Sequence, residues 1–400
     1  MLRSFYYLLI SQSSTKLAYS LYTMTIITFL YQETNSATFA SAVTIISMLS
    51  SLMSGSTVPL MMEKYSLKSI LLLSQICQLI IYAFIVITLY FVPSPVNFIL
   101  LFLFLALISF FNGWTTPARS ALIPEIVLKE KLVNANSILS TTDQTLLLLG
   151  WSAGGALIVY FGHFNVIMIT IALLLISIIS LLFLKTKAQA MKQKEHKNKF
   201  DTLKEGWVIV FKHPTLSTIT KMDIIELFGG SIWIGAVTLV FVQEALGQDE
   251  KWWGYINSAY YAGTIIGGIL VWKLSKYIHK SLVTSMIIGS IGVAILTIIY
   301  SFVSVPFVAL LLVILMGPLY QMRDIAQNTF IQNSVEKDVL GKYLASKATI
   351  NQAVFSLSVF IIGLLVDLVS ARFVYLFSGV LLLCSAIYGY LKLGKTAKKS

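Results

Sequence analysis

The stretch EKYSLKS occupies residues 63–69, and SKYIHKS occupies residues 275–281. Lys, Tyr, Lys and Ser recur at matching positions in these two basic heptapeptides. Charged residues make up only 12% of the chain, so a chance recurrence of this kind is unexpected. The repetition favours two similar halves, each with one copy of the same basic loop.

The composition is that of an integral membrane protein. Of the 400 residues, 57% are hydrophobic and the mean hydropathy is +0.83. A soluble domain has about 25% charged residues, because its surface must stay polar. Apolar runs of about 20 residues match a hydrocarbon core roughly 30 Å thick, and within lipid such runs must be helices. The alternating pattern of a membrane β-barrel is absent.

The chain contains twelve apolar windows, each long enough for one spanning helix. They cover residues 4–31, 37–62, 67–93, 96–123, 134–160, 164–184, 215–245, 252–274, 282–303, 305–332, 343–367 and 373–392. The long polar stretch KTKAQAMKQKEHKNKFDTLKEGW separates the sixth window from the seventh. We expect it to be a linker that forms a short helix on the membrane surface from Asp201 onward.

The positive charges predict how the chain is oriented. The net charge is +12, yet only Lys251 and Arg372 fall in loops that would be outside if the N-terminus is inside. This bias places both termini in the cytoplasm of a multi-pass plasma-membrane protein, and it disfavours nucleic-acid binding.

The sequence lacks the usual signs of an enzyme or a metal protein. The phosphate-binding pattern GxxxxGK[ST] is missing, so we expect no ATP hydrolysis. The four histidines and two cysteines show no metal-ligand spacing. We therefore expect a non-enzymatic protein without cofactor or bound metal.

Further matched pairs extend the repeat along the chain. They are Lys16 with Lys221, Lys64 with Lys276, Arg119 with Arg323, and Asp143 with Asn351. In chain order they are offset by 205, 212, 204 and 208 residues. We infer six-helix halves at 1–184 and 214–400, joined by a cytoplasmic linker at 185–213. Parallel repeats of this kind rock around a midplane site in alternating access.

The twin heptapeptides are then corresponding cytoplasmic loops. Their lysines can reach carbonyl ends or acidic groups of neighbouring helices when the inner mouth closes. Simple anchoring by positive charge is the alternative, although the recurring Tyr and Ser favour a specific loop structure. The candidate gate residues are Glu63, Lys64, Lys68, Lys276 and Lys280.

Over almost its whole length the chain resembles the major facilitator superfamily. That family has a loop of the form Gly-x3-Asp-Arg-x-Gly-Arg-Lys between helices two and three. Here PLMMEKYSLK keeps its charges, with Pro59 at the glycine, Glu63 at the acid, and Lys64 and Lys68 at basic positions. The resemblance implies twelve helices and transport by alternating access.

Two further segments are similar to the macrolide-efflux branch of the drug:proton antiporters. They are PARSALIPEIVLKEKLVNANSIL (residues 117–139) and LGWSAGGALIVYFG (residues 149–162). Gly150, Gly154 and Gly155 match the antiporter motif's glycines, which let helices pack closely; ordinary membrane packing is the alternative. The opening SQSSTKLAYS resembles that branch as well, but Tyr19 stands where the branch has an acid.

A charged side chain within a membrane span is costly, so each one is a candidate functional residue. Arg119 and Asp143 lie at similar distances from the loop that joins their helices. We expect them to share one depth and to form either a structural ion pair or a proton-linked switch.

Helix seven carries KMDIIE, which brings Lys221, Asp223 and Glu226 towards mid-membrane. The two carboxylates are the leading candidates for carrying protons. Neutralisation of Lys221 by its own helix neighbours is the alternative. The spacings of two and five residues favour partners on other helices, such as Lys16.

Aromatic residues are plentiful, and most are expected to pack or to form interface belts. Some could stack against a planar substrate. The candidate cavity residues are Lys16, Tyr19, Tyr22, Trp114, Lys221, Trp233, Tyr261 and Arg323.

These patterns favour a monomeric, proton-coupled exporter of small organic molecules. Two lysines in the cavity and the missing acid at Tyr19 favour a cargo that carries carboxylates. An opine (staphylopine-type) metallophore is one such cargo, beside macrolide-like drugs. An importer of a nutrient or metal chelate is the alternative, and a membrane scaffold or receptor is a third reading.

Overall fold

A computed structural model describes residues 3–34, 36–91, 96–186, 199–233 and 235–397. All regular structure in these ranges is helical, and each predicted apolar window overlaps a helix. The first half contains α1 (Arg3–Thr34), α2 (Ala37–Lys64), α3 (Leu67–Phe91), α4 (Val96–Gly113), α5 (Thr115–Ile126), η1 (Lys129–Lys131) and α6 (Leu132–Phe183). Next come α7 (Lys199–Lys212), α8 (Pro214–Gly230), η2 (Ser231–Trp233), α9 (Gly235–Glu244), α10 (Glu250–Lys273) and α11 (Ser275–Lys280). The chain closes with α12 (Leu282–Ser301), α13 (Pro306–Ser334), α14 (Lys337–Leu368) and α15 (Ala371–Ala397).

Eight helices of the described chain are long and apolar enough to cross a membrane, or nine if the broken pair α8–α9 counts as one. The sequence predicted twelve spans. The predicted spans outside this set lie in α1, the first part of α6 and α10, which carry more polar side chains. Such helices in a membrane protein face other helices or water rather than lipid.

A single glycine divides α6 into two helices. Gly162 has φ 75° and ψ 162°, a backbone conformation that interrupts the helix. Glycine adopts positive φ without the steric penalty that a Cβ brings. The break falls between the windows predicted at 134–160 and 164–184, so α6 contains both.

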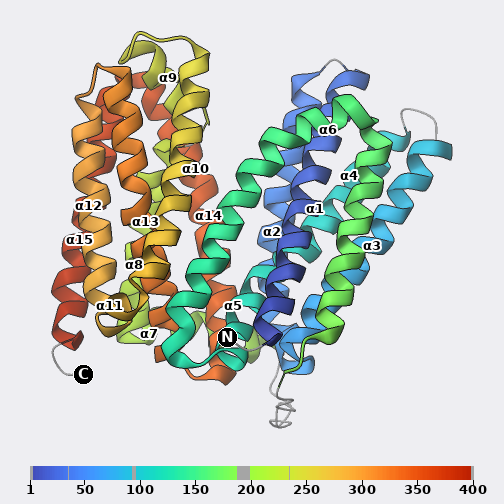
Figure 1. Ribbon diagram of the computed structural model, residues 1–400, viewed down its shortest axis with the longest axis horizontal. Coiled ribbons are helices and arrows are strands. Elements are labelled where there is room, and N and C mark those ends of the chain that lie inside the picture. Colours follow the sequence, from blue (N-terminus) through green and yellow to red (C-terminus); the bar gives the residue numbers. More distant parts are fainter. Residues whose placement is uncertain (1–2, 35, 92–95, 187–198, 234, 398–400) are drawn as a thin grey trace. The chain divides into compact units, whose positions relative to one another are not determined.

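The chain forms two compact units (Figure 1). Unit 1 comprises residues 1–128, 145–206 and 336–349, and unit 2 comprises residues 129–144, 207–335 and 350–400. Each unit is built mainly from one predicted half, with one short segment contributed by the other. The predicted boundaries of the halves stay a prediction, and residues 187–198 of the predicted linker lie outside the described residues.

The core of unit 1 is an apolar cluster from α1, α2, α3, α4 and the second part of α6. Tyr22, Ile85, Leu101 and Leu105 are fully buried there. Tyr22 meets Tyr82 edge to face, with 4.8 Å between the ring centroids. Burial of large aromatic and aliphatic side chains fixes how these helices pack.

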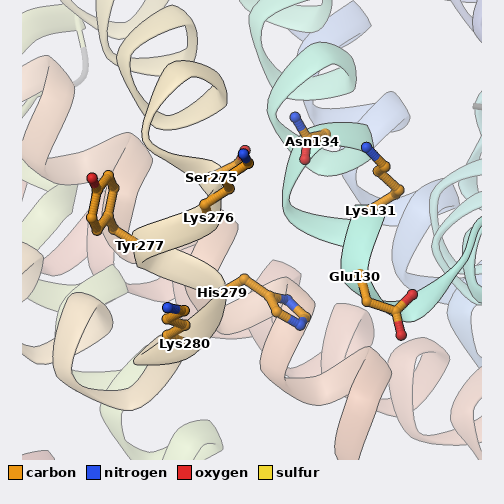
Figure 2. Close-up of a pocket in the computed structure, with 8 residues that line it drawn as sticks. All are labelled: Glu130, Lys131, Asn134, Ser275, Lys276, Tyr277, His279 and Lys280. Atoms are coloured by element: carbon orange, nitrogen blue, oxygen red, sulfur yellow. The ribbon is translucent and has the colours of Figure 1, made fainter.

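In unit 2, helices α8, α12, α13 and α15 surround the charged residues described below. Gly317 of α13 packs directly on the backbone of Gly263 in α10. Near α9, Phe241, Tyr300 and Tyr375 form a buried aromatic cluster. At another place in unit 2, η1 and α11 border a pocket (Figure 2).

Candidate functional site

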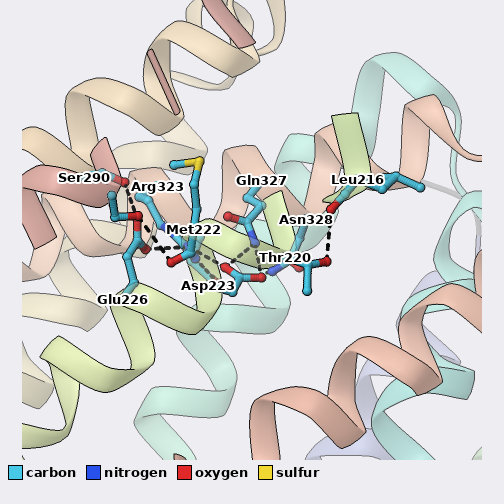
Figure 3. Close-up of polar contacts among 11 residues, drawn as sticks. Leu216, Thr220, Met222, Asp223, Glu226, Ser290, Arg323, Gln327 and Asn328 are labelled. Carbon is cyan, nitrogen blue, oxygen red and sulfur yellow. Dashed lines mark hydrogen bonds and ion pairs between the residues drawn. The ribbon is translucent and has the colours of Figure 1, made fainter. Parts of the chain in front are cut away.

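One arginine joins two carboxylates in unit 2 (Figure 3). Nη2 of Arg323 on α13 lies 2.5 Å from Oδ1 of Asp223 and 2.5 Å from Oε2 of Glu226, both on α8. The side chains are 10%, 4% and 15% exposed, in that order. Two carboxylates therefore share one guanidinium in a site with little access to solvent.

The two carboxylates have different further partners. The Nε2 amide of Gln327 donates to both oxygens of Asp223, at 2.9 and 3.1 Å. Oε1 of Glu226 instead accepts from the hydroxyls of Ser290 on α12 and Ser385 on α15, at 3.0 and 3.2 Å. An amide N–H can only donate, whereas a hydroxyl can also accept. This difference decides which carboxyl can take up a proton without losing its contacts.

Helical spacing explains the arrangement. Asp223 and Glu226 are three residues apart on α8, and Arg323 and Gln327 are four residues apart on α13, so each pair shares one helix face. Gly289 lets α12 approach, because a Cβ there would meet the carbonyl of Leu319 and the backbone of Arg323. Close helix packing thus brings the two polar faces together.

Asp324 adds a third acid at the edge of the cluster. Its Oδ1 lies 3.9 Å from Nη1 of Arg323, and its side chain is 35% exposed. Asn328, four residues further along α13, donates to Oδ2 of Asp324 at 3.2 Å. Arg323 thus lies among three carboxylates, two of them at close range.

The spacing along α8 predicts partners on other helices for the two carboxylates, such as Lys16. Within unit 2 both carboxylates contact Arg323, which was predicted only as a cavity residue. Lys221 is exposed, and both carboxylates pair with Arg323 rather than with this neighbour. The match of Arg119 with Arg323 in the repeat was the signal that could have assigned Arg323. No signal marked Ser290 or Ser385, because serine is common in apolar helices.

The candidate charges of the first half are divided between the units. Lys16 is half-buried in α1, and Arg119 is half-buried in α5. Asp143 is half-buried in the part of α6 that belongs to unit 2, whereas Arg119 belongs to unit 1. The pairing of Arg119 with Asp143 stays a prediction. Tyr19, at the position of the family's acid, shares a 3.2 Å hydrogen bond with Ser109.

Several candidate aromatic residues are packed in helix interfaces. Trp114 is 5% exposed, and its indole N–H donates to Oγ1 of Thr57 at 2.9 Å. Tyr22 is fully buried, and Trp233 packs edge to face on Tyr300. These placements favour the packing role that we expected for most aromatics. Tyr261 is half-buried.

The two basic loops have different contacts. In unit 1, Nζ of Lys342 donates to Oε1 of Glu63 at 2.9 Å. Nζ of Lys68 donates to the carbonyls of Leu182 and Leu184 at the end of α6, at 3.0 and 2.7 Å. A lysine is favourable there, because the last carbonyls of a helix carry partial negative charge.

The other gate candidates are solvent-accessible. Lys64 ends α2 and is exposed. Lys276 and Lys280 are exposed on α11 in unit 2, and both line the pocket beside η1.

The glycines of the predicted antiporter motif pack against α1. A Cβ on Gly150 would overlap the side chain of Ser20, and one on Gly154 would meet Sδ of Met24 at 3.0 Å. A Cβ on Gly155 would lie 3.4 Å from Cε of the same methionine. Small residues on α6 therefore let α1 approach closely, which both the motif and ordinary membrane packing predict.

A family model described as "Major Facilitator Superfamily" matches residues 8–358. The chain belongs to the major facilitator superfamily. A curated relative is the uncharacterized MFS-type transporter YfmI of Bacillus subtilis (strain 168), 40% identical over 98% of this chain and 97% of the relative. The uncharacterized MFS-type transporter YjbB of the same organism is 29% identical over 94% and 91% of the two chains.

Solved structures of transporters share the fold at low identity. An outward-facing bacterial homologue of the iron transporter ferroportin has a TM-score of 0.79 at 14% identity, covering 98% of this chain and 100% of that one. The proton:xylose symporter XylE has a TM-score of 0.73 at 12% identity, covering 98% and 96%. At such identities the likeness shows the fold alone.

Membership in the major facilitator superfamily confirms two predictions. The protein is an all-helical, multi-pass membrane transporter, and it is not an enzyme. The described residues contain no group of three or more His, Cys, Asp or Glu side chains that could hold a metal ion.

Proposed function

We propose that this transporter is a proton-coupled exporter of small organic molecules and that Glu226 carries the coupling proton. The observation that carries the proposal is the sharing of Arg323 by Asp223 and Glu226. With all three groups ionised, the formal charge is minus one. One added proton makes the cluster neutral, so a buried site can hold either state without an unpaired arginine.

The hydrogen bonds favour Glu226 over Asp223 as the proton carrier. Both oxygens of Asp223 accept from Gln327, and a protonated carboxyl would lose one of these contacts. Glu226 contacts two hydroxyls, either of which can turn to accept from a protonated carboxyl. Glu226 is also the more exposed of the two, which gives the proton a route to water.

Proton exchange can drive transport if it changes the attraction between α8 and α13. The ionised Glu226 holds Arg323 strongly, whereas the neutral acid keeps only a hydrogen bond. Protonation therefore weakens the link between these helices and leaves Arg323 with Asp223 as its close ionised partner. A ligand can shift such an equilibrium only through different affinities for the two states.

The direction of export rests on the resemblance to the efflux branch, including the packing of Gly150 and Gly154 on α1. For the cargo, Lys16 and Lys221 favour a molecule with carboxylates, such as an opine metallophore of the staphylopine type. Macrolide-like drugs are the other cargo class. Proton-coupled import of a nutrient or metal chelate remains the alternative, since a solved structure with this fold is named a proton:xylose symporter.

The test uses inside-out vesicles containing the full-length protein. Uptake of a labelled macrolide and of a labelled aminocarboxylate chelate is measured with and without an imposed pH gradient, beside a pH-sensitive dye. We expect Glu226→Gln to fold and to retain downhill exchange but to lose uphill transport by at least tenfold, because it cannot release a proton. Lys16→Ala should weaken uptake of the chelate more than that of the macrolide.

Asp223→Asn is the matched control on the same helix face. It should lower folding stability while the remaining activity stays coupled to the pH gradient. Full pH-driven uphill transport by Glu226→Gln would refute Glu226 as the proton carrier. Uptake of both probes in right-side-out vesicles only, driven by an inward proton gradient, would establish import instead.

A further inference from the structure

Unit 2 contains a pocket of about 490 Å³ that the transport proposal does not use (Figure 2). Its walls are η1 with the beginning of α6 on one side, and α11 on the other. Three lysines line it, namely Lys131, Lys276 and Lys280. All three are exposed, so their ammonium groups are free to meet a ligand from solution or from the membrane surface.

The other lining groups include hydrogen-bond donors suited to an anion. Asn134 offers an amide and Ser275 a hydroxyl. His279 also lines the pocket, and its buried Nδ1 has no hydrogen-bond partner among the described residues. Three ammonium groups with neutral donors around one cavity match the chemistry of a phosphate group, which accepts several charge-assisted hydrogen bonds.

One acid counts against an anion. Glu130 lines the same pocket, so its carboxylate lowers the formal charge of the lining from plus three, for the three lysines, to plus two. Figure 2 shows its carboxylate turned away from α11, whereas the side chain of Lys131 points towards α11. The balance of charge around the cavity therefore remains positive.

The surroundings of the pocket match a membrane–water boundary. It lies at α11, between the end of α10 and the start of the apolar span Leu282–Ser301. Exposed apolar and aromatic side chains flank the site: Trp272 is 46% exposed, Leu274 48% and Tyr277 74%. Trp and Tyr are enriched at bilayer interfaces, where lipid headgroups also lie. This location favours a phosphate carried by a lipid over a free phosphate.

We propose that the pocket binds the phosphate of an anionic phospholipid headgroup. Lys131, Lys276 and Lys280 neutralise the phosphate, and Asn134 and Ser275 donate hydrogen bonds to it. The acyl chains extend along the apolar surface beside Leu274. An anionic lipid would thereby connect η1, which lies between the fourth and fifth predicted spans, with α11, which lies between the eighth and ninth.

The test measures lipid binding directly and needs no transport cargo. Full-length protein in detergent is titrated with phosphatidylglycerol or with phosphatidylcholine, and bound lipid is counted by native mass spectrometry. The variant Lys131→Gln, Lys276→Gln, Lys280→Gln is compared with Lys212→Gln, Lys251→Gln, Lys337→Gln, which removes three exposed lysines elsewhere. We expect phosphatidylglycerol affinity to fall about fivefold for each pocket lysine removed, with little change in the control variant.

A third arm adds inorganic phosphate or glycerol 3-phosphate as a competitor. Weak competition at millimolar concentration is expected if the lipid is the ligand. Competition by soluble phosphate at the same concentration as the lipid would assign the pocket to a free phosphate compound and overturn the lipid proposal. Equal losses in the pocket and control variants, or equal binding of both lipids, would refute the site. Neither result depends on whether Glu226 carries protons.

Discussion

The two predicted halves share an arginine but differ in the residues at the positions of Asp223 and Glu226. Arg119 and Arg323 are matched in the repeat, and Arg323 contacts Asp223 and Glu226. Lys16 and Lys221 give an offset of 205 residues between α1 and α8, and this offset matches Asp223 with Ala18 and Glu226 with Leu21. The first half therefore has apolar residues where the second half has both carboxylates.

The first half shows that these helix positions can be packed without charged residues. Ala18 is fully buried and Leu21 is 2% exposed, so apolar residues fill the corresponding helix positions without difficulty. A buried ion pair is weak support for stability, because desolvation of the charges offsets most of their attraction. Acids at these positions in the second half only, where the first half packs without them, support the proposal that Glu226 carries the proton.

The largest expected effect follows from removing the shared cation. Arg323→Met leaves two buried carboxylates without their close partner, a change that destabilises by about 3–5 kcal/mol when a buried pair is broken. We expect a marked loss of folded protein, measured by thermal unfolding in detergent. The matched variant Arg119→Met should have a smaller effect if the comparison between the halves is correct.

Neutralising the acids provides the control. The triple variant Arg323→Met, Asp223→Asn, Glu226→Gln removes both close carboxylates together with Arg323 and keeps only Asp324, whose side chain is 35% exposed. It should recover most of the stability while remaining unable to couple protons. If the triple variant is no more stable than Arg323→Met, the loss comes from packing of the arginine stem and the charge argument fails. An Arg119→Met variant as unstable as Arg323→Met would remove the contrast between the halves.

Much of the fold was predictable because helix formation in a membrane depends on composition. The apolar windows located the helices, and the gap between two windows fell at Gly162, where the backbone of α6 breaks. The count of twelve spans came from the apolar windows, and three of them lie in α1, the first part of α6 and α10, which carry more polar residues. The grouping of residues 129–144 and 336–349 into the opposite units had no sequence signal, because it depends on long-range packing.

The two acids of the candidate site could be predicted from the sequence, but the residues that they contact could not. Asp223 and Glu226 stood out because charges are rare in apolar helices. Which cation they contact depends on how α8 and α13 pack, and the spacing along α8 could not distinguish Arg323 from Lys16. Gln327 and the two serines of the cluster are unremarkable in sequence, although the proposed choice of Glu226 over Asp223 rests on their contacts.

An intermediate effect is expected at the glycine that brings α12 to the cluster. A Cβ at Gly289 would meet backbone atoms of Leu319 and Arg323, which cannot move aside as a flexible side chain can. Gly289→Ala should destabilise by about 1–3 kcal/mol through overpacking, and it should also weaken uphill transport by displacing Ser290 from Glu226. Thermal unfolding and the vesicle assay measure the two effects.

Gly230 supplies the matched control on α8. A Cβ there would meet nothing within 4 Å, so Gly230→Ala should leave stability within about 0.5 kcal/mol of the parent. Similar losses in both variants would mean that helix flexibility, rather than the approach of α12, explains the result. The close approach of α12 to Arg323 would then not explain how the second half differs from the first.

The smallest effect is expected at the two basic loops, where the acid is in the first loop rather than the second. Glu63 begins the first heptapeptide and pairs with Lys342, whereas Ser275 begins the second. The side chains of Lys342 and Glu63 are 10% and 29% exposed, so water screens part of their attraction. We expect a coupling energy of no more than about 1 kcal/mol between them.

A double-mutant cycle measures the coupling energy between Glu63 and Lys342. Glu63→Gln, Lys342→Gln and the double variant are compared by thermal unfolding and by transport rate, with Ser275→Ala as the corresponding change in the other loop. Each single variant should leave one charge unpaired and lower stability slightly, and the double variant should lose less than the sum of the two. Because the pair ties α2 to α14 within unit 1, breaking it should change the transport rate while coupling to protons stays intact. Strict additivity would show that Glu63 and Lys342 act independently, and the first loop would then differ from the second only in charge, not in a specific contact.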